Sequence, residues 1–342
     1  MPEGELDWAR SEVPRISCVI PCRNEARNLV RLLPELTQML AGLAEHFEVV
    51  LVDDGSTDES PALMQAWAQR PGIRVLQLSR NFGKEAALTA GLEAAMGDVV
   101  ILMDADLQHP PSLIPAMLAR WREGADVVYA CRHDRSDEGT LKRLGTRAFY
   151  RLVNLGDRFQ LPEGAGDFRL LDRTAVDALL ALPERNRFMK GLYAWIGFKA
   201  VALPYEPPPR HAGRSSFSTR RLAALAVTGI TAFTNAPLRW WSALGVLLAL
   251  PAFAFGLFIV VEHFLTGHDV PGWATLVTGL MFSSGLQLLS IGILGEYIGR
   301  IFDEVKQRPL YIVGHREGAG WGGGTATVAP AAQANGARVL TA

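Results

Sequence analysis

The segment Val99-Val-Ile-Leu-Met-Asp104-Ala-Asp106-Leu-Gln108 is the most informative part of the sequence for the fold. An uninterrupted apolar run of this length is typical of a strand buried on both faces, and here it passes directly into two carboxylates. We predict strands at Ile16–Pro21, Glu48–Asp53, Arg74–Leu78 and Val99–Asp104, separated by helices near Glu25–Gly42, Ser60–Arg70 and Glu85–Met96. This alternation predicts an α/β fold, with a mostly parallel sheet covered by helices on both faces.

Polar clusters follow three of the predicted strands. They are Pro21-Cys-Arg23-Asn24-Glu25, Asp53-Asp54-Gly-Ser56 and Asp104-Ala-Asp106-Leu-Gln108. In open parallel sheets the ligand binds beyond the carboxyl ends of the strands, so we expect these clusters to line one site.

Asp104 and Asp106 suit a divalent metal ion. Two carboxylates at alternate positions, where the chain leaves a strand, can hold Mg²⁺ or Mn²⁺ beside the phosphates of a nucleotide. Gln108 adds an oxygen ligand, whereas loop packing is the simpler interpretation of His109. The Asp-x-Asp pattern alone is a weak signal, because it is common in unrelated proteins.

The other clusters allow two interpretations each. Asp53 and Asp54 could accept hydrogen bonds from a ribose hydroxyl or a base N–H, or they could form a turn that opens the next helix. Arg80-Asn-Phe-Gly-Lys84 precedes a predicted helix, so Lys84 or Arg80 could contact a phosphate. A solvated surface loop is the alternative.

Two apolar runs predict membrane spans. Trp240–Val261 and Trp273–Leu294 each hold 22 residues without a charge, which is enough for a helix to cross a bilayer. Buried core helices are the alternative. Basic residues flank the two runs and are absent from the loop between them, so we expect a multi-pass protein of the cytoplasmic membrane with both chain ends in the cytoplasm.

These runs set the expected domain boundaries. We predict a polar N-terminal tail at 1–14 without a signal peptide, a cytosolic catalytic domain at 15–215 and an interfacial segment at 216–239. The spans then occupy 240–262 and 273–298, and a cytosolic tail at 299–342 becomes disordered from about 317.

A basic amphipathic helix is predicted at Leu141–Leu155. Arg143, Arg147 and Arg151 repeat every four residues on one face, and leucines occupy another. This pattern indicates binding to a membrane surface, and an ordinary solvated face is the alternative.

Composition excludes other classes of protein. The net charge of −1 creates no field that would draw the chain to nucleic acid, and no P-loop motif is present. Three cysteines without a Cys-x-x-Cys pair fit a reducing compartment.

Together, the four clusters resemble a known family. Their order along the chain is similar to that of the inverting family-two glycosyltransferases with a GT-A fold. The closer resemblance is to polyprenyl-phosphate glycosyltransferases, such as dolichol-phosphate mannosyltransferase and the bacterial enzymes that charge undecaprenyl phosphate. It covers about residues 15–312 and includes a two-helix C-terminal anchor.

The resemblance implies roles for individual residues. It places the nucleoside against Pro21, Arg23, Asn24, Glu25, Asp53 and Asp54, and the diphosphate and metal against Asp104, Asp106 and Gln108. It further assigns a phosphate to Arg132, the sugar to the segment with Asp167 and an acceptor-side loop to Arg185–Gly197. Asp167 is a candidate catalytic residue for positioning or base work, and a structural hydrogen bond is the alternative. Arg210, Arg214 and Ser215 would close over the donor phosphates. The sequence departs from the family at Ser216, where Lys is usual.

The implied reaction is sugar transfer from a nucleotide-diphosphate sugar to a polyprenyl phosphate. One rival is a processive polysaccharide synthase, but Ala236 replaces the Gln that such enzymes carry before Arg239-Trp240. A non-catalytic membrane scaffold is the other. The sequence leaves open the sugar, the choice between a GDP- and a UDP-sugar, and whether the chain forms a homo-oligomer.

Overall fold

The computed structural model describes residues 10–132, 165–185, 187–205, 236–266 and 272–320. The chain divides into two compact units. The first comprises residues 1–129, 167–176 and 311–342, and the second comprises residues 130–166 and 177–310. The predicted helix with Arg143, Arg147 and Arg151 and the segment with Arg210, Arg214 and Ser215 lie outside the described residues.

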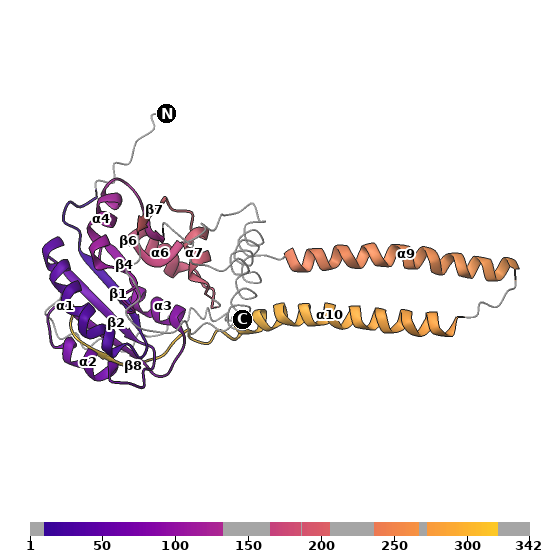
Figure 1. The fold of residues 1–342 in the computed structure, drawn as a ribbon, viewed down its shortest axis with the longest axis horizontal. Coiled ribbons are helices and arrows are strands. Elements are labelled where there is room, and N and C mark those ends of the chain that lie inside the picture. Colours follow the sequence, from indigo (N-terminus) through magenta and orange to yellow (C-terminus); the bar gives the residue numbers. More distant parts are fainter. Residues whose placement is uncertain (1–9, 133–164, 186, 206–235, 267–271, 321–342) are drawn as a thin grey trace, which may run out of the picture. The chain divides into compact units, whose positions relative to one another are not determined.

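The first unit alternates strands and helices as the sequence predicts (Figure 1). Its early elements are β1 (Ile16–Cys22), α1 (Ala26–Leu43), β2 (Phe47–Asp53), α2 (Ser60–Ala68), β3 (Ile73–Leu78), α3 (Lys84–Ala94) and β4 (Val99–Leu102). A short 3-10 turn (Pro111–Leu113), α4 (Ile114–Arg122), β5 (Val127–Arg132), β6 (Ala165–Asp172) and finally β8 (Val313–Glu317) follow. The predicted α/β fold is confirmed. Because β4 ends at Leu102, the loop that carries the two carboxylates begins two residues earlier than predicted.

Strand pairing gathers the strand ends of this unit. The strands follow the order β5-β6-β4-β1-β2-β3-β8. The four strands from β4 to β3 are parallel, with Val19 opposite Leu102, and Asp53 between Cys22 and Gln77. β6 runs antiparallel to β4, with Arg169 opposite Leu102. The amino end of β6 therefore lies beside the carboxyl end of β4.

Helices α2 and α3 cover opposite faces of the sheet. A Cβ at Gly91 of α3 would lie 2.2 Å from Cγ1 of Val19 and 3.2 Å from Cγ2 of Val52. Asp53, the next residue of β2, instead lines a pocket with Pro61 and Met64 of α2. Since successive residues of a strand point to opposite faces, the sheet is covered on both sides, as the sequence predicts.

A buried carboxylate ties the amino ends of the parallel strands together. Glu48 is fully buried and accepts hydrogen bonds from Oγ of Ser17 (2.7 Å) and N of Met96 (2.8 Å). Its other oxygen lies 3.4 Å from the guanidinium of Arg74. A buried charge is stable only when it is paired in this way. These contacts therefore fix the amino ends of the strands, at the opposite end of the sheet from the polar clusters.

The strand β8 was not predicted from the sequence. It pairs antiparallel with β3, with His315 opposite Gln77 and Glu317 opposite Val75. Backbone bonds continue beyond the strand, because N of Gly72 donates to O of Gly320 (3.2 Å). The C-terminal tail thus completes one edge of the sheet, and the described chain runs to Gly320.

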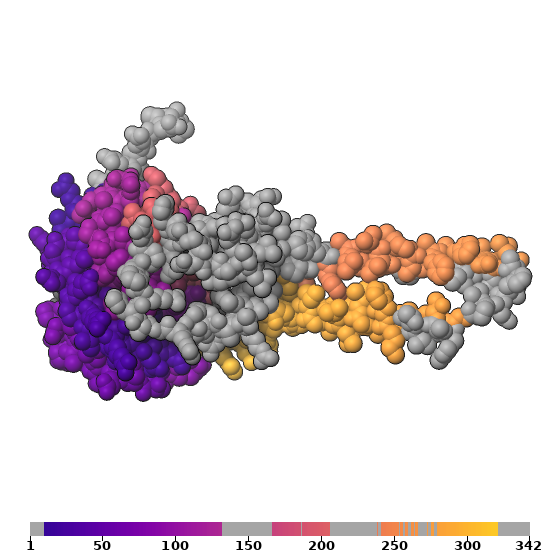
Figure 2. Space-filling model, viewed as in Figure 1, coloured from indigo at the N-terminus to yellow at the C-terminus, as the bar shows by residue number. Residues whose placement is uncertain are grey.

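The second unit contains two long helices. It includes part of α6 (Arg173–Ala181), then α7 (Met189–Trp195), β7 (Ala200–Tyr205), α9 (Ala236–Thr266) and α10 (Trp273–Lys306). α9 and α10 lie side by side (Figure 1), and Nε1 of Trp241 donates to Oγ of Ser290. Figure 2 shows the surfaces of both helices uncovered along most of the face in view.

One segment among the described residues is long and apolar enough to cross a membrane. This is Gly279–Lys306 of α10, where Met281 is 74% and Leu288 is 70% exposed. In α9 the described residues give a shorter apolar stretch, Trp241–Ala252. The structure thus bears out one of the two predicted spans as a candidate. α10 also continues beyond residue 298, where the second span was expected to end.

Replacing Gly318 with alanine tests whether the C-terminal segment completes the sheet. Gly318 has a φ of +80°, and a Cβ there would lie 2.2 Å from O of Ile73. We expect Gly318→Ala to lower the free energy of unfolding by at least about 1–2 kcal/mol, the usual penalty of this backbone conformation for an L-residue. Denaturant unfolding of the purified protein in detergent measures the change.

Gly314→Ala is the matched control within β8. A Cβ at Gly314 would lie no closer than 3.4 Å to its nearest neighbour, Cα of Ser79, which is ordinary contact. We expect a change within about 0.5 kcal/mol. Equally small effects for both variants would contradict the pairing of this segment with β3.

Candidate functional site

The loop after β1 is joined to the loop after β2. N of Asn24 donates to Oγ of Ser56 (2.9 Å), and Oδ1 of Asn24 accepts from N of Thr57 (2.7 Å). Asn24 has a φ of +57°, a conformation that asparagine tolerates better than most residues. N of Glu25 also donates to Oγ of Ser60 (2.9 Å). Two of the predicted clusters therefore form one continuous surface.

Asp54 fixes the loop that leads into α3. Its buried carboxylate accepts hydrogen bonds from Nδ2 of Asn81 (2.7 Å), N of Phe82 (2.7 Å) and N of Gly83 (3.0 Å). Burial raises the pKa of Asp54, and the backbone donors and the charge of Arg23 only partly offset that effect. The protein itself thus uses this carboxylate to position the residue that follows Gly83, which is Lys84.

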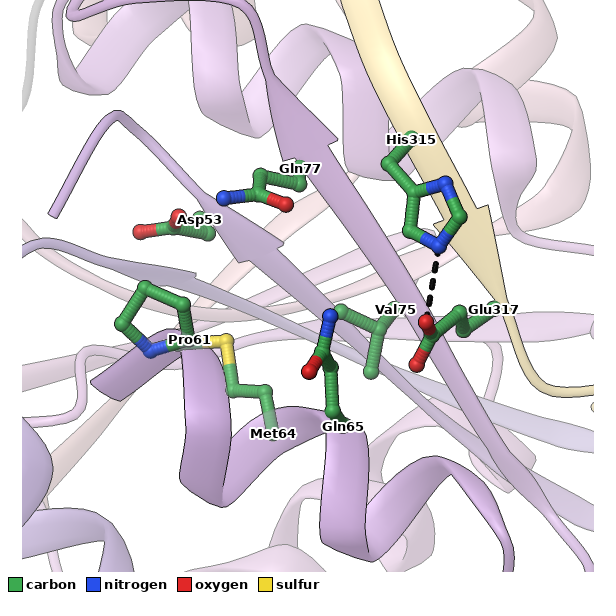
Figure 3. A pocket seen from close by; sticks show the side chains of 8 residues that line it. All are labelled: Asp53, Pro61, Met64, Gln65, Val75, Gln77, His315 and Glu317. Atoms are coloured by element: carbon green, nitrogen blue, oxygen red, sulfur yellow. Dashed lines mark hydrogen bonds and ion pairs between the residues drawn. The ribbon is translucent and has the colours of Figure 1, made fainter. Parts of the chain in front are cut away.

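Asp53 keeps one acceptor atom unused. Its Oδ1 accepts a hydrogen bond from N of Ser56 (3.0 Å), which makes the turn that the second interpretation predicts. Its Oδ2 is buried and has no hydrogen-bond partner within the part of the chain that the structure describes. Asp53 lines a pocket with Gln77 and His315, its neighbours across β3 and β8 (Figure 3). A ligand donor at Oδ2 would remove the cost of the unpaired oxygen.

The loop after β4 fixes the carboxylate of Asp106. Oδ1 of Asp106 accepts a hydrogen bond from N of Gln108 (3.0 Å), and Leu107 between them has a φ of +59°. This left-handed conformation costs a non-glycine residue about 1–2 kcal/mol. Strain of this kind persists where the surroundings enforce it, and it concentrates at functional sites.

Lys84 bridges two carboxylates from separate strands. Its Nζ lies 2.7 Å from Oδ1 of Asp104 and 2.6 Å from Oδ2 of Asp167. Burial lowers the pKa of Lys84, but the charges of Asp167 and Asp104 outweigh that effect and raise the pKa above its ordinary value. Lys84 is therefore protonated at neutral pH.

Glu25 and His109 respond to the same negative charge. The pKa of Glu25 is raised, chiefly by burial and further by Asp106 and Asp104, while a hydrogen bond from Asn28 opposes the shift. Burial lowers the pKa of His109 more than the nearby carboxylates raise it. The His109 ring lies against Phe168, with ring centroids 5.4 Å apart, and this contact favours loop packing.

Comparisons with known proteins show the family of the chain. The family described as "Glycosyl transferase family 2" matches residues 17–180. An uncharacterized glycosyltransferase from Synechocystis sp. is 42% identical over 299 residues, covering 87% of this chain and 94% of that protein. The chain belongs to glycosyltransferase family 2.

Two further relatives of this family-2 glycosyltransferase carry more specific names. The SfII prophage-derived bactoprenol glucosyl transferase of Shigella flexneri is 41% identical over 300 residues, covering 87% of this chain and 97% of the relative. The prophage bactoprenol glucosyl transferase homolog of Escherichia coli K12 is 39% identical over 300 residues, covering 87% and 98%.

The structure brings together a core set of the predicted site residues in the glycosyltransferase. At the carboxyl ends of the four parallel strands lie Asn24, Glu25, Asp53, Asp54, Lys84, Asp104 and Asp106. Asp167 is linked to this group by its ion pair with Lys84, which also pairs with Asp104. Pro21 and Arg23 lie at the end of β1, and Gln108 lies in the β4 loop. Arg132 ends β5, and its side chain is outside the described residues. The roles of all these residues stay predictions.

Three contacts of the site were not predicted. Asn81 donates a hydrogen bond to Asp54, Phe168 packs on His109, and His315 lines the same pocket as Asp53, with Gln77 between them. Asn81 lies in the segment Arg80–Lys84, in which only the two cations were predicted to contact a ligand. The other two depend on β6 and β8, whose pairing the sequence does not reveal.

The oxygen ligands of the β4 loop fit a hard divalent cation. Among the described residues no group of three or more His, Cys, Asp or Glu side chains is arranged to hold a metal. Asp104 and Asp106 offer two carboxylates, and such a pair leaves coordination positions for ligand oxygens, as suits Mg²⁺ or Mn²⁺ at a phosphate site. Asp104 already carries a cationic partner, the Lys84 ammonium.

Removing the Asp54 carboxylate tests its structural role. Asp54→Ala leaves the N–H groups of Phe82 and Gly83 without their acceptor, so we expect unfolding free energy to fall by about 2 kcal/mol or more. Hydrogen exchange should accelerate at these two amides. Asp53→Asn is the control, because its Oδ1 can still accept from Ser56 and stability should change little. Unchanged exchange at both amides in Asp54→Ala would refute this role.

Proposed function

We propose that this glycosyltransferase transfers a sugar from a nucleotide-diphosphate sugar to a polyprenyl phosphate, with inversion and with a divalent cation, at the cytoplasmic face of a membrane. The similarity to bactoprenol glucosyl transferases carries the proposal. It extends over 300 residues and 87% of this chain, so it includes the long helices as well as the sheet.

Asp53 supports a nucleotide as donor. Its buried Oδ2 needs a hydrogen-bond donor, and a base N–H or a ribose hydroxyl supplies one. The joined loops that carry Asn24 and Ser56 form the surface on which the nucleoside would lie.

The β4 loop supports a diphosphate leaving group. Asp104 and Asp106, with Gln108, would hold Mg²⁺ or Mn²⁺, and the ion would neutralise the charge that develops on the departing nucleoside diphosphate. Lys84, at the first turn of α3, adds a cation and a helix N-terminus to the same region. These groups would stabilise the added negative charge on the departing diphosphate more than the charge that the bound donor already carries, as catalysis requires.

The proposed acceptor needs no strong base. A phosphate monoester has a second pKa near 6, so at neutral pH its oxygen is already an anionic nucleophile. That oxygen attacks the anomeric carbon, the bond to the nucleoside diphosphate breaks and the configuration inverts. Asp167 is engaged by Lys84, and we therefore assign it a positioning role beside the sugar.

The predicted acceptor loop has an anchor within the second unit. N of Arg185 donates to Oε1 of Glu304 (2.9 Å), near the carboxyl end of α10, and the Arg185 guanidinium donates to O of Arg308. Lys306 and Arg300 lie on the same end of the helix. If α10 spans the bilayer, this loop meets the lipid headgroup region, where a lipid phosphate would arrive.

Membrane fractions and a panel of donors test the reaction. We expect organic-extractable label when a radiolabelled nucleotide sugar is added together with undecaprenyl phosphate, and none without that lipid. EDTA should abolish the transfer, and Mg²⁺ or Mn²⁺ should restore it. Asp106→Asn should lose at least ~100-fold in rate, as for the loss of a major electrostatic stabiliser.

The outcomes separate the parts of the proposal. Full activity in EDTA would refute the requirement for a divalent cation. Absence of lipid-linked label for every donor, in protein that still binds a nucleoside diphosphate by calorimetry, would leave the enzyme class intact and refute the acceptor.

Reporter fusions test the two proposed spans. A reporter after Ala342 and one inserted at Gly267 should report opposite sides, with the C-terminal one cytoplasmic. Charge asymmetry of the flanks sets this orientation. Both reporters on one side would rule out two spans.

A further inference from the structure

We propose that Lys84 is a built-in counter-cation, which holds Asp104 while the donor is absent and must leave it before a divalent cation binds. This inference rests on the proposed function, because it assigns the order in which that donor and its metal are bound.

The contacts of Lys84 compete directly with a metal. Its ammonium lies 2.7 Å from Oδ1 and 2.8 Å from Oδ2 of Asp104, so it occupies both oxygens of that carboxylate. A magnesium ion binds carboxylate oxygen at about 2.0–2.1 Å. An ion bound to the same group would lie within roughly 5 Å of the ammonium, where two positive charges repel strongly in a partly buried site.

The position of Lys84 in α3 is explained by the site and not by the helix. Lys84 is the first residue of α3, where the helix dipole disfavours a positive side chain. Its two carboxylate partners compensate for that. They come from the loop after β4 and from the start of β6, so Lys84 also holds this loop to β6, although their two carboxylates would otherwise repel.

The surroundings show how much negative charge Lys84 balances. Asp104 and Asp106 both raise the pKa of Glu25, so their field extends across the site. Removing the ammonium would leave Asp104 and Asp167 facing each other without a cation between them. A metal ion would then bind more readily to Asp104.

Lys84 is able to move when a diphosphate arrives. Its side chain is 41% exposed, and a lysine stem is flexible. The Lys84 ammonium, beside the positive end of the α3 dipole, attracts an anion. A diphosphate placed there draws Lys84 away from Asp104, and the metal takes the freed carboxylate. Nucleotide and metal should therefore each raise the affinity of the other, by the same factor.

Mn²⁺ binding to the purified protein in detergent tests this order without any turnover. Free Mn²⁺ is followed by electron paramagnetic resonance, alone and with UDP or GDP as the probe nucleotide. We expect wild type to bind Mn²⁺ at least ~10-fold more tightly when the nucleotide is present, which is within the usual range of such coupling.

Lys84→Met should bind Mn²⁺ at least ~10-fold more tightly than wild type in the absence of nucleotide. Its coupling factor should fall toward one, and its nucleotide affinity should decrease. Mn²⁺ alone should also raise the melting temperature of Lys84→Met more than that of wild type, which provides a second readout. Lys84→Arg keeps the charge and should keep the coupling.

Arg27→Met is the matched control. Arg27 is an exposed cation on the first turn of α1, so its loss removes one positive charge from the same unit without removing a partner of Asp104. Its Mn²⁺ affinity should match that of wild type. A similar gain in Mn²⁺ affinity in Arg27→Met and Lys84→Met would show that the effect comes from net charge alone, and it would overturn the inference.

Failure of this inference and failure of the proposed function look different. If wild type shows coupled binding and Lys84→Met shows the same Mn²⁺ affinity and the same coupling, the counter-cation role is wrong and the donor assignment stands. If wild type binds neither nucleoside diphosphate with Mn²⁺, the proposed donor and this inference fall together.

Discussion

The parallel pairing of β4, β1 and β2 is the constraint on which the site depends. Cys18 of β1 lies between Val49 of β2 and Ile101 of β4, in buried strands that carry no charge at these positions. Because these strands run in one direction, their carboxyl ends form one edge of the sheet. Residues more than 80 positions apart, such as Arg23 and Asp104, thereby belong to one surface.

Asp53 and Asp54, at the end of β2, make different contacts. The Asp54 carboxylate accepts hydrogen bonds from the backbone before α3. Asp53 points to the other side of the strand, and its Oδ2 has no hydrogen-bond partner among the described residues. A single carboxylate could not do both, because the donors of the α3 loop and the unpaired Oδ2 lie in different directions. Two neighbouring carboxylates therefore serve two different places, the loop before α3 and the pocket that Asp53 lines.

The sequence was sufficient to predict the strands that carry the site, but not the contacts between distant segments. Apolar runs such as Val99–Leu102 have one stable environment, and the polar residues that follow them must lie at the strand end. β8 has the sequence Val-Gly-His-Arg-Glu, and nothing in such a polar segment indicates that it pairs with β3. The bridge from Lys84 to Asp167 likewise depends on β6 running against β4, which no local pattern encodes.

The late position of β8 in the chain has a consequence for biosynthesis. A ribosome completes β3 long before it reaches residue 313, and both long apolar helices are made in between. During that interval the outer edge of β3 has no partner strand, and an open strand edge invites pairing with other chains. The helices are therefore synthesised before β8 can pair with β3. A chain that stalls before residue 313 leaves a nascent domain in which the edge of β3 can pair with other chains.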